Sequence, residues 1–248
     1  MDLTLIQMLS IAVLVLLGAV VQGTIGFGLA IVAAPFLLLI HPELVPGPVL
    51  FFGMSSAAFN VWANRAGLAF RELTLALVAR VPGTLLAMVV LVVASPSVLS
   101  VLLGLSVLAA VVLSIRTPYV ERTRRVMFTA GFMSGFMGTT TAIGGPPIAL
   151  AYQSATGPEA RANLGGYMLV GMIASLFALV LIGRFTGEHL TISLIMLVPV
   201  VLGVYLARIL APLINPAWLR PALLVLCSIS GTVALAKGGL ELLPWFAS

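Results

Sequence analysis

Long apolar runs separated by short polar or basic loops dominate this chain, and two of the runs are interrupted. The first run, residues 3–40, carries no charge and is 38 residues long, about twice the ~20 residues that a membrane-spanning helix needs. Glycines and small polar residues interrupt it at 22–28, and His41-Pro42 ends it. This pattern predicts two helical pieces joined by an irregular segment.

Three ordinary apolar segments follow the first run, at residues 45–64, 73–94 and 98–115. Pro82-Gly83 is expected to break the second of these segments. The second half repeats the plan, with an interrupted run at 126–155 and ordinary segments at 162–182, 190–210 and 218–236. The sequence therefore predicts an all-α protein in which each half contributes a Gly/Pro-interrupted helical hairpin and three transmembrane helices.

The two interrupted runs also share residues. When the chain is compared with itself at an offset of 112 residues, six of the 24 positions from 19 to 42 are identical, more than so apolar a composition gives by chance. A Gly/Pro-interrupted hydrophobic segment in corresponding positions of two halves is the best sequence indication of a transporter's binding site. The identical pairs are Gly23/Gly135, Gly26/Gly138, Ala30/Ala142, Ile31/Ile143, Pro35/Pro147 and Leu38/Leu150.

The composition places the chain in a membrane. Apolar residues make up 61% and charged residues 8% of the 248 positions, whereas about 25% charged is usual for a soluble domain. The single cysteine, Cys227, allows no intrachain disulfide and no cysteine metal cluster. The formal charge of +5 comes mostly from residues beside apolar segments, so it is better explained by helix orientation than by nucleic-acid binding.

Two transmembrane repeats are expected, residues 1–115 and 126–248, joined by a basic cytoplasmic linker at 116–125. As one continuous helix, the run 126–155 would be about 45 Å long, against ~30 Å of hydrocarbon. That length favours two half-helices that meet near the midplane, which makes the repeats inverted. Parallel repeats with one crossing per interrupted run are the alternative, and counting basic residues barely separates the two models.

The glycine-rich breaks are expected in the protein interior, because non-helical backbone at membrane depth must be buried or line a wet cavity. Half-helix N-termini there would present backbone N–H groups to an anion, and threonine hydroxyls would add donors. The alternative is that the glycines only let helices pack closely. The candidate anion-binding residues in the breaks are Gln22, Gly23, Thr24, Gly26, Gly28, Gly138, Thr139, Thr140, Thr141, Gly144 and Gly145.

Arg80 is the one basic residue placed well inside an apolar segment, where a charge costs on the order of 2.5–3.5 kcal/mol on insertion scales. Either its side chain snorkels to the cytoplasmic interface, or it faces the substrate path as a counter-charge. Asn60 and Gln153, like Gln22, are neutral polar candidates for the same path. They could instead form hydrogen bonds between helices.

All seven acidic residues lie in loops or near the termini. Sodium- and proton-coupled carriers commonly keep a carboxylate in the membrane, so this distribution disfavours a cation substrate. It also leaves no nucleophile–base pair and no metal ligands for an enzyme, and no cofactor is expected. An anion channel is the alternative to a carrier, because pores use the same backbone rings and short hairpins.

The glycine patterns at 18–35 and 131–147, the latter reading GFMSGFMG and GGPP around a threonine run, resemble the sulfite exporter TauE/SafE family of membrane permeases. The length, the two-half plan and the basic central loop agree with this resemblance. It implies transport of sulfite, a sulfonate or another small anion across the bacterial cytoplasmic membrane. In one departure, Ile31-Val32-Ala33-Ala34 replaces a glycine run that is frequent in the family's first repeat, so residues 139–145 would carry more of the anion contact.

These observations predict a non-enzymatic secondary transporter with a small anion bound between the two breaks. Rocking of one repeat against the other would expose the site to the two sides in turn. The expected partners are the small anion and the lipid bilayer, with no nucleic acid. A homodimer is left open by the sequence.

Overall fold

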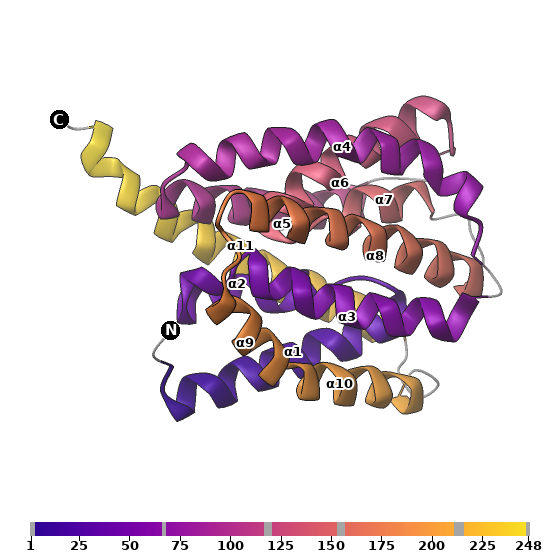
Figure 1. The fold of residues 1–248 in the computed structure, drawn as a ribbon, viewed down its shortest axis with the longest axis horizontal. Coiled ribbons are helices and arrows are strands. Elements are labelled where there is room, and N and C mark those ends of the chain that lie inside the picture. The colour runs from indigo at the N-terminus through magenta and orange to yellow at the C-terminus, as the bar shows by residue number, and fades with distance from the viewer. Residues whose placement is uncertain (1–2, 66–67, 117–120, 153–156, 211–215, 247–248) are drawn as a thin grey trace.

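The computed structural model describes residues 3–65, 68–116, 121–152, 157–210 and 216–246, and the regular structure in these ranges is entirely helical (Figure 1). The first half contains α1 (Leu5–Ile25), α2 (Leu29–Ile40), the 3₁₀ turn η1 (Pro42–Leu44), α3 (Gly47–Asn64), α4 (Phe70–Val93) and α5 (Pro96–Arg116). The second half contains α6 (Arg124–Thr141), α7 (Gly145–Ala151), α8 (Gly157–Leu181), α9 (Gly187–Ile195), α10 (Leu197–Leu210) and α11 (Pro216–Phe246).

Among the described residues, five helices are long and apolar enough to cross a membrane, and six if α9 and α10 form one bent span. The protein is therefore a multi-pass membrane protein. The break predicted at Pro82-Gly83 in the segment 73–94 is wrong, because α4 continues through Pro82 from Phe70 to Val93. The segment predicted at 190–210 is two helices instead, bent by 41°. Pro199 lies in the first turn of α10, where it lacks an N–H and disfavours a continuous helix.

The first interrupted run begins with a helix of full length. Thr4 caps α1 by accepting a hydrogen bond from the Gln7 N–H, and 21 residues make a helix about 30 Å long. Gly26 ends it with a φ of 92°, and Gly28 follows with a φ of 120°, a conformation that favours glycine. The expected pair of half-helices is thus wrong here, because the break follows a whole span and precedes the 12 residues of α2.

The second break lies one helical turn later than the sequence comparison places it. Thr123 caps α6, and the helix runs through Thr141 to Ala142, which adopts a left-handed φ of 64°. Gly26 and Ala142, the two left-handed residues that end their helices, are 116 residues apart rather than 112. Gly138, which the offset of 112 pairs with Gly26, therefore lies inside α6.

At each break the chain folds back on the helix it has just left. A Cβ atom on Gly18 would lie 3.0 Å from the carbonyl oxygen of Leu29, the first residue of α2. A Cβ atom on Gly144 would lie 2.7 Å from the carbonyl oxygen of Ser134 in α6. The absence of a side chain at these two glycines lets the returning backbone approach so closely, and this geometry agrees with the predicted hairpins.

The two halves pack through reciprocal helix pairs. Helix α1 of the first half lies along α10 of the second, and α6 of the second half lies along α4 of the first (Figure 1). The remaining large contacts join α3 to α8 and α5 to α11, again one helix from each half. The interface between the halves is therefore the core of the molecule rather than a surface between two separate domains.

Glycines set the separation of the reciprocal pairs. Between α4 and α6, a Cβ atom on Gly83 would overlap the Phe132 carbonyl oxygen, and one on Gly131 would overlap the Ala76 backbone. Between α10 and α1, a Cβ atom on Gly203 would lie 2.6 Å from the Leu16 carbonyl oxygen. Close packing, the alternative reading of glycines in the sequence, holds for these positions.

The Gly83→Ala variant is expected to unfold at a lower temperature than the parent protein. The added methyl group meets backbone atoms of α6, which cannot rotate away, and overpacking of this kind costs about 1–3 kcal/mol. The matched control is Gly239→Ala in α11, where an added Cβ has no neighbour within 4 Å. Thermal unfolding in detergent checks this expectation, and equal melting temperatures for the two variants would contradict the close approach of α4 and α6.

Candidate functional site

The two breaks meet inside the molecule. Gly145, the first residue of α7, packs against the ring of Phe27 from the first break, and a Cβ atom there would lie 2.7 Å from the Phe27 Cδ2 atom. Gln22 fixes the first break, because its Nε2 donates to the Gly53 carbonyl at 2.9 Å and its Oε1 accepts from the Leu29 N–H at 3.3 Å. Asn60 Nδ2 donates to the Gln22 carbonyl at 3.0 Å. These two predicted path residues thus form the interhelical hydrogen bonds named as their alternative role.

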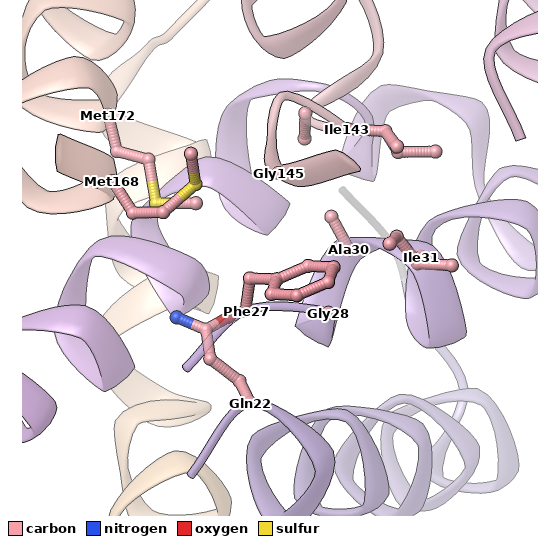
Figure 2. A pocket seen from close by; sticks show the side chains of 10 residues that line it. Gln22, Phe27, Gly28, Ala30, Ile31, Ile143, Gly145, Met168 and Met172 are labelled. Carbon is pink, nitrogen blue, oxygen red and sulfur yellow. The ribbon is translucent and has the colours of Figure 1, made fainter. Parts of the chain in front are cut away.

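A narrow cavity lies where the breaks meet (Figure 2). Gln22 brings its only polar side chain, and the two thioethers of Met168 and Met172 face the ring of Phe27 across it. In this conformation the space suits about one water-sized molecule. The other lining residues are Gly28, Ala30, Ile31, Ala142, Ile143 and Gly145.

Arg80 lies near the middle of α4 and is 3% exposed. Its Nη1 donates to Ser134 Oγ and its Nη2 donates to Ser175 Oγ, each at 3.0 Å. Its Cζ atom stands 5.5 Å from the centre of the Tyr167 ring, within the range of a cation–π contact. The side chain therefore does not snorkel to an interface but ends inside the protein, between α4, α6 and α8.

The charge of Arg80 has no counter-charge among the side chains that the structure describes. The guanidinium Nε atom is buried without a hydrogen-bond partner, and Arg80 is the one charged side chain buried in the described part of the chain. The carboxylate side chains that the structure describes are all exposed, and they are those of Glu43, Glu121, Glu188 and Glu241. The side chains of Asp2, Glu72 and Glu159 lie outside that description. A buried charge is costly unless it is paired and hydrogen-bonded, and this guanidinium has two hydroxyl partners but no described carboxylate beside it.

Glycines make the space for the guanidinium. A Cβ atom on Gly138 would lie 2.9 Å from Arg80 Nη2, and one on Gly171 would overlap the guanidinium from α8. A Cβ atom on Gly135 would overlap the Arg80 carbonyl oxygen. Gly144, the residue before α7, lies against Gly138. Of the glycines predicted for the site, Gly138 thus lies against Arg80, and Gly144 lies against Gly138 and Ser134.

The threonine run divides into two roles. Thr139 Oγ1 lies 2.7 Å from Ser175 Oγ and donates to Thr84 Oγ1 at 3.3 Å, so it belongs to the cluster around Arg80. Thr140 and Thr141 instead donate to carbonyls of their own helix, each at 2.8 Å. The three are predicted to lie beside broken backbone, and this holds for Thr141, which directly precedes Ala142 and accepts from the Ile143 N–H at 3.4 Å. Thr139 and Thr140 lie inside α6.

The second break offers fewer backbone N–H donors to an anion than the sequence predicts. Helix α7 begins with Gly145, Pro146 and Pro147, and the prolines have no N–H to offer an anion. In the first break, Thr24 Oγ1 donates to the Val21 carbonyl at 2.8 Å, and Gly23 lies inside α1 against Ala207. Gln153 lies outside the described residues.

Four residues of the Arg80 cluster were not singled out from the sequence, namely Ser134, Tyr167, Gly171 and Ser175. Tyr167 is fully buried, and its hydroxyl donates to the Gly131 carbonyl at 3.4 Å. Ser134 also donates to the Gly144 carbonyl, so it ties the second break to the arginine. Each is a polar or small residue inside an apolar run, and that signal does not show which way a residue faces.

The fold defines a multi-pass α-helical membrane protein whose two halves pack helix against helix, and Arg80 is the one buried cation among the side chains that the structure describes. A family model described as Sulfite exporter TauE/SafE matches residues 11–233. The chain belongs to this family of membrane transporters, as the resemblance in its glycine patterns predicted. No curated protein and no solved structure matches the chain.

Ala142 offers a test of the geometry at the second break. A non-glycine residue in the left-handed region costs about 1–2 kcal/mol, so Ala142→Gly is expected to keep or slightly raise the melting temperature of the protein. Ala142→Val is expected to lower it, because a β-branched residue tolerates this conformation poorly. Thermal unfolding of both variants measures the effect, and the opposite order would contradict a left-handed end of α6.

Proposed function

We propose that the protein is a secondary transporter that binds a small sulfur oxyanion or sulfonate at Arg80 and carries it across the bacterial cytoplasmic membrane. The observation that carries this proposal is the buried guanidinium with no carboxylate partner among the described residues. Family membership supports the chemistry of the cargo, since the matching model is that of a sulfite exporter.

The donors around Arg80 suit an oxyanion. A guanidinium presents its N–H groups in a planar fork that fits two oxygens of one anion. The hydroxyls of Ser134, Thr139 and Ser175 lie beside it, within 3.0 Å of the guanidinium or of one another. In our proposal an anion replaces the serine hydroxyls as the acceptor of the Arg80 hydrogen bonds, and the freed hydroxyls donate to it.

The position of Arg80 suits alternating access. Arg80 comes from α4 of the first half, while its partners Ser134 and Ser175 come from α6 and α8 of the second. A site between the halves is opened to either side when one half rocks against the other. The reciprocal packing of α1 on α10 and of α4 on α6 supports a movement of one half against the other.

The cavity at the meeting of the breaks is proposed as part of the access path. Met172 lines it, and the preceding residue, Gly171, lies against Arg80. The first turn of α2, which includes Ala30 and Ile31, also lines the cavity, and first-turn N–H groups lack partners within the helix. An anion on its way to Arg80 would pass these donors after the thioethers move aside.

The Arg80→Gln variant is expected to lose the stabilisation that sulfite or a sulfonate gives to the purified protein. A ligand that binds the folded state raises the apparent melting temperature, and the glutamine removes the charge that binds it. Without ligand, the same variant is expected to be at least as stable as the parent, because an unpaired buried charge is removed. Arg80→Lys should keep part of the ligand effect. If the ligand raises the melting temperature of Arg80→Gln as much as that of the parent protein, the assignment of the site to Arg80 is contradicted.

The adjacent threonines provide a matched pair of variants. Thr139→Val is expected to weaken sulfite binding about tenfold, or about 1.4 kcal/mol, because its hydroxyl lies in the Arg80 cluster. Thr140→Val is the control, since its hydroxyl donates to the Phe136 carbonyl of the same helix. Titration calorimetry of both variants measures the difference, and equal affinities would remove Thr139 from the site.

A further inference from the structure

We propose that this protein is an obligatory anion exchanger, in which one anion leaves its site only in return for another. The inference rests on the proposed function, because it assigns the transported anion to Arg80. It adds a second substrate, namely a counter-anion of the same chemical class taken up from the opposite side of the membrane.

The first argument is the charge of the closed state. In this structure the Arg80 side chain is 3% exposed and is held only by two neutral hydroxyls and an aromatic ring. An empty carrier that passes through this state keeps an uncompensated cation in a medium of low dielectric constant. With a singly charged anion bound, the same site is neutral. The loaded carrier therefore closes and reopens more readily than the empty one.

The second argument is the connection between the halves. In this structure Arg80 of α4 ties the first half to α6 through Ser134 and to α8 through Ser175. Its neighbour Ser134 continues the connection to the carbonyl of Gly144 at the second break. A bound anion competes for the guanidinium and loosens these ties. The empty carrier is thus both charged and cross-linked, which slows its return.

The charges of the described residues indicate that the returning substrate is an anion. A proton or sodium ion could return in place of an anion only if a group in the transport path bound it, and such groups are usually buried carboxylates. The four carboxylate side chains that the structure describes, those of Glu43, Glu121, Glu188 and Glu241, are exposed, and none of them is buried beside Arg80. An oxyanion that fits the cargo site fits the return step as well.

The test uses the full chain, purified and reconstituted into lipid vesicles, with the membrane potential clamped. Initial uptake of radiolabelled sulfite is compared between vesicles that contain unlabelled sulfite and vesicles that contain only gluconate, a bulky anion. Exchange predicts uptake at least about tenfold faster with sulfite inside, because the loaded carrier is the one that returns. Equal uptake under the two conditions would overturn the inference while leaving anion transport at Arg80 intact.

Two variants test separately the charge of Arg80 and its hydrogen bond to the second half. In Arg80→Gln, internal sulfite should no longer accelerate uptake. In Ser175→Ala, which removes one hydrogen bond between the halves but keeps the charge, the ratio of uptake with internal sulfite to uptake with internal gluconate should fall. The control is Arg208→Gln, since Arg208 is exposed on α10 over the Trp62 ring, and its exchange should match that of the parent.

The failures of the two proposals are distinguishable. If no sulfite or sulfonate enters under any internal condition, the proposed function fails and the exchange inference fails with it. If uptake proceeds as a current that follows the applied potential and ignores internal sulfite, the protein conducts anions as a channel and exchange is overturned. Acceleration by internal sulfite that survives in Arg80→Gln would also overturn the inference, because the arginine charge would then not govern the return step.

Discussion

The burial of one positive charge governs the arrangement around the centre of this protein. Arg80 comes from the middle of an apolar helix, and its side chain ends where α4, α6 and α8 meet. Its neighbours have the properties that a buried guanidinium requires. Glycines at 138 and 171 leave room for it, serines accept its hydrogen bonds, and the ring of Tyr167 lies beside it. What the site lacks, within the described residues, is an anionic partner.

The surroundings of Arg80 also require that the two halves pack closely, and this packing depends on backbone geometry. The reciprocal pairs α1–α10 and α4–α6 approach through glycines, and the two breaks meet at Phe27 and Gly145. Without a hydrophobic driving force between helices in lipid, such contacts and interhelical hydrogen bonds supply much of the association energy. The proposed site is therefore built on the same interface that holds the molecule together, which is why our proposal links binding there to movement of the halves.

The sequence predicted the helical class, the membrane location and most of the spans, because the length of an apolar run directly reflects the thickness of the bilayer. It placed the two breaks within segments that are longer than the breaks themselves. Glycines at 23 and 138 suggested earlier helix ends, whereas the helices continue to Ile25 and Thr141. A glycine inside a membrane helix and a glycine that ends one look alike in sequence. Pro82 shows the same ambiguity, since membrane helices tolerate proline when neighbours satisfy the freed carbonyl.

The sequence also does not reveal the direction in which a side chain points. Helices that are apolar on all sides show no polar stripe that would reveal their buried face. Arg80 was recognised as unusual, but its hydrogen bonds to Ser134 and Ser175 join positions 54 and 95 residues away. The order of residues along the chain does not predict contacts between positions so far apart. The same holds for the threonine run, where one hydroxyl joins the cluster and two bind their own helix.

The most direct test of this account is a crystal structure of the protein soaked with selenite, a heavier analogue of sulfite whose selenium atom is located by anomalous scattering. The account predicts a selenium peak beside the Arg80 guanidinium, with selenite oxygens in hydrogen-bonding distance of Arg80 and of the hydroxyls of Ser134, Thr139 or Ser175. A peak at the start of α2 or at the exposed ends of the helices, with Arg80 still bonded to its two serines, would contradict it.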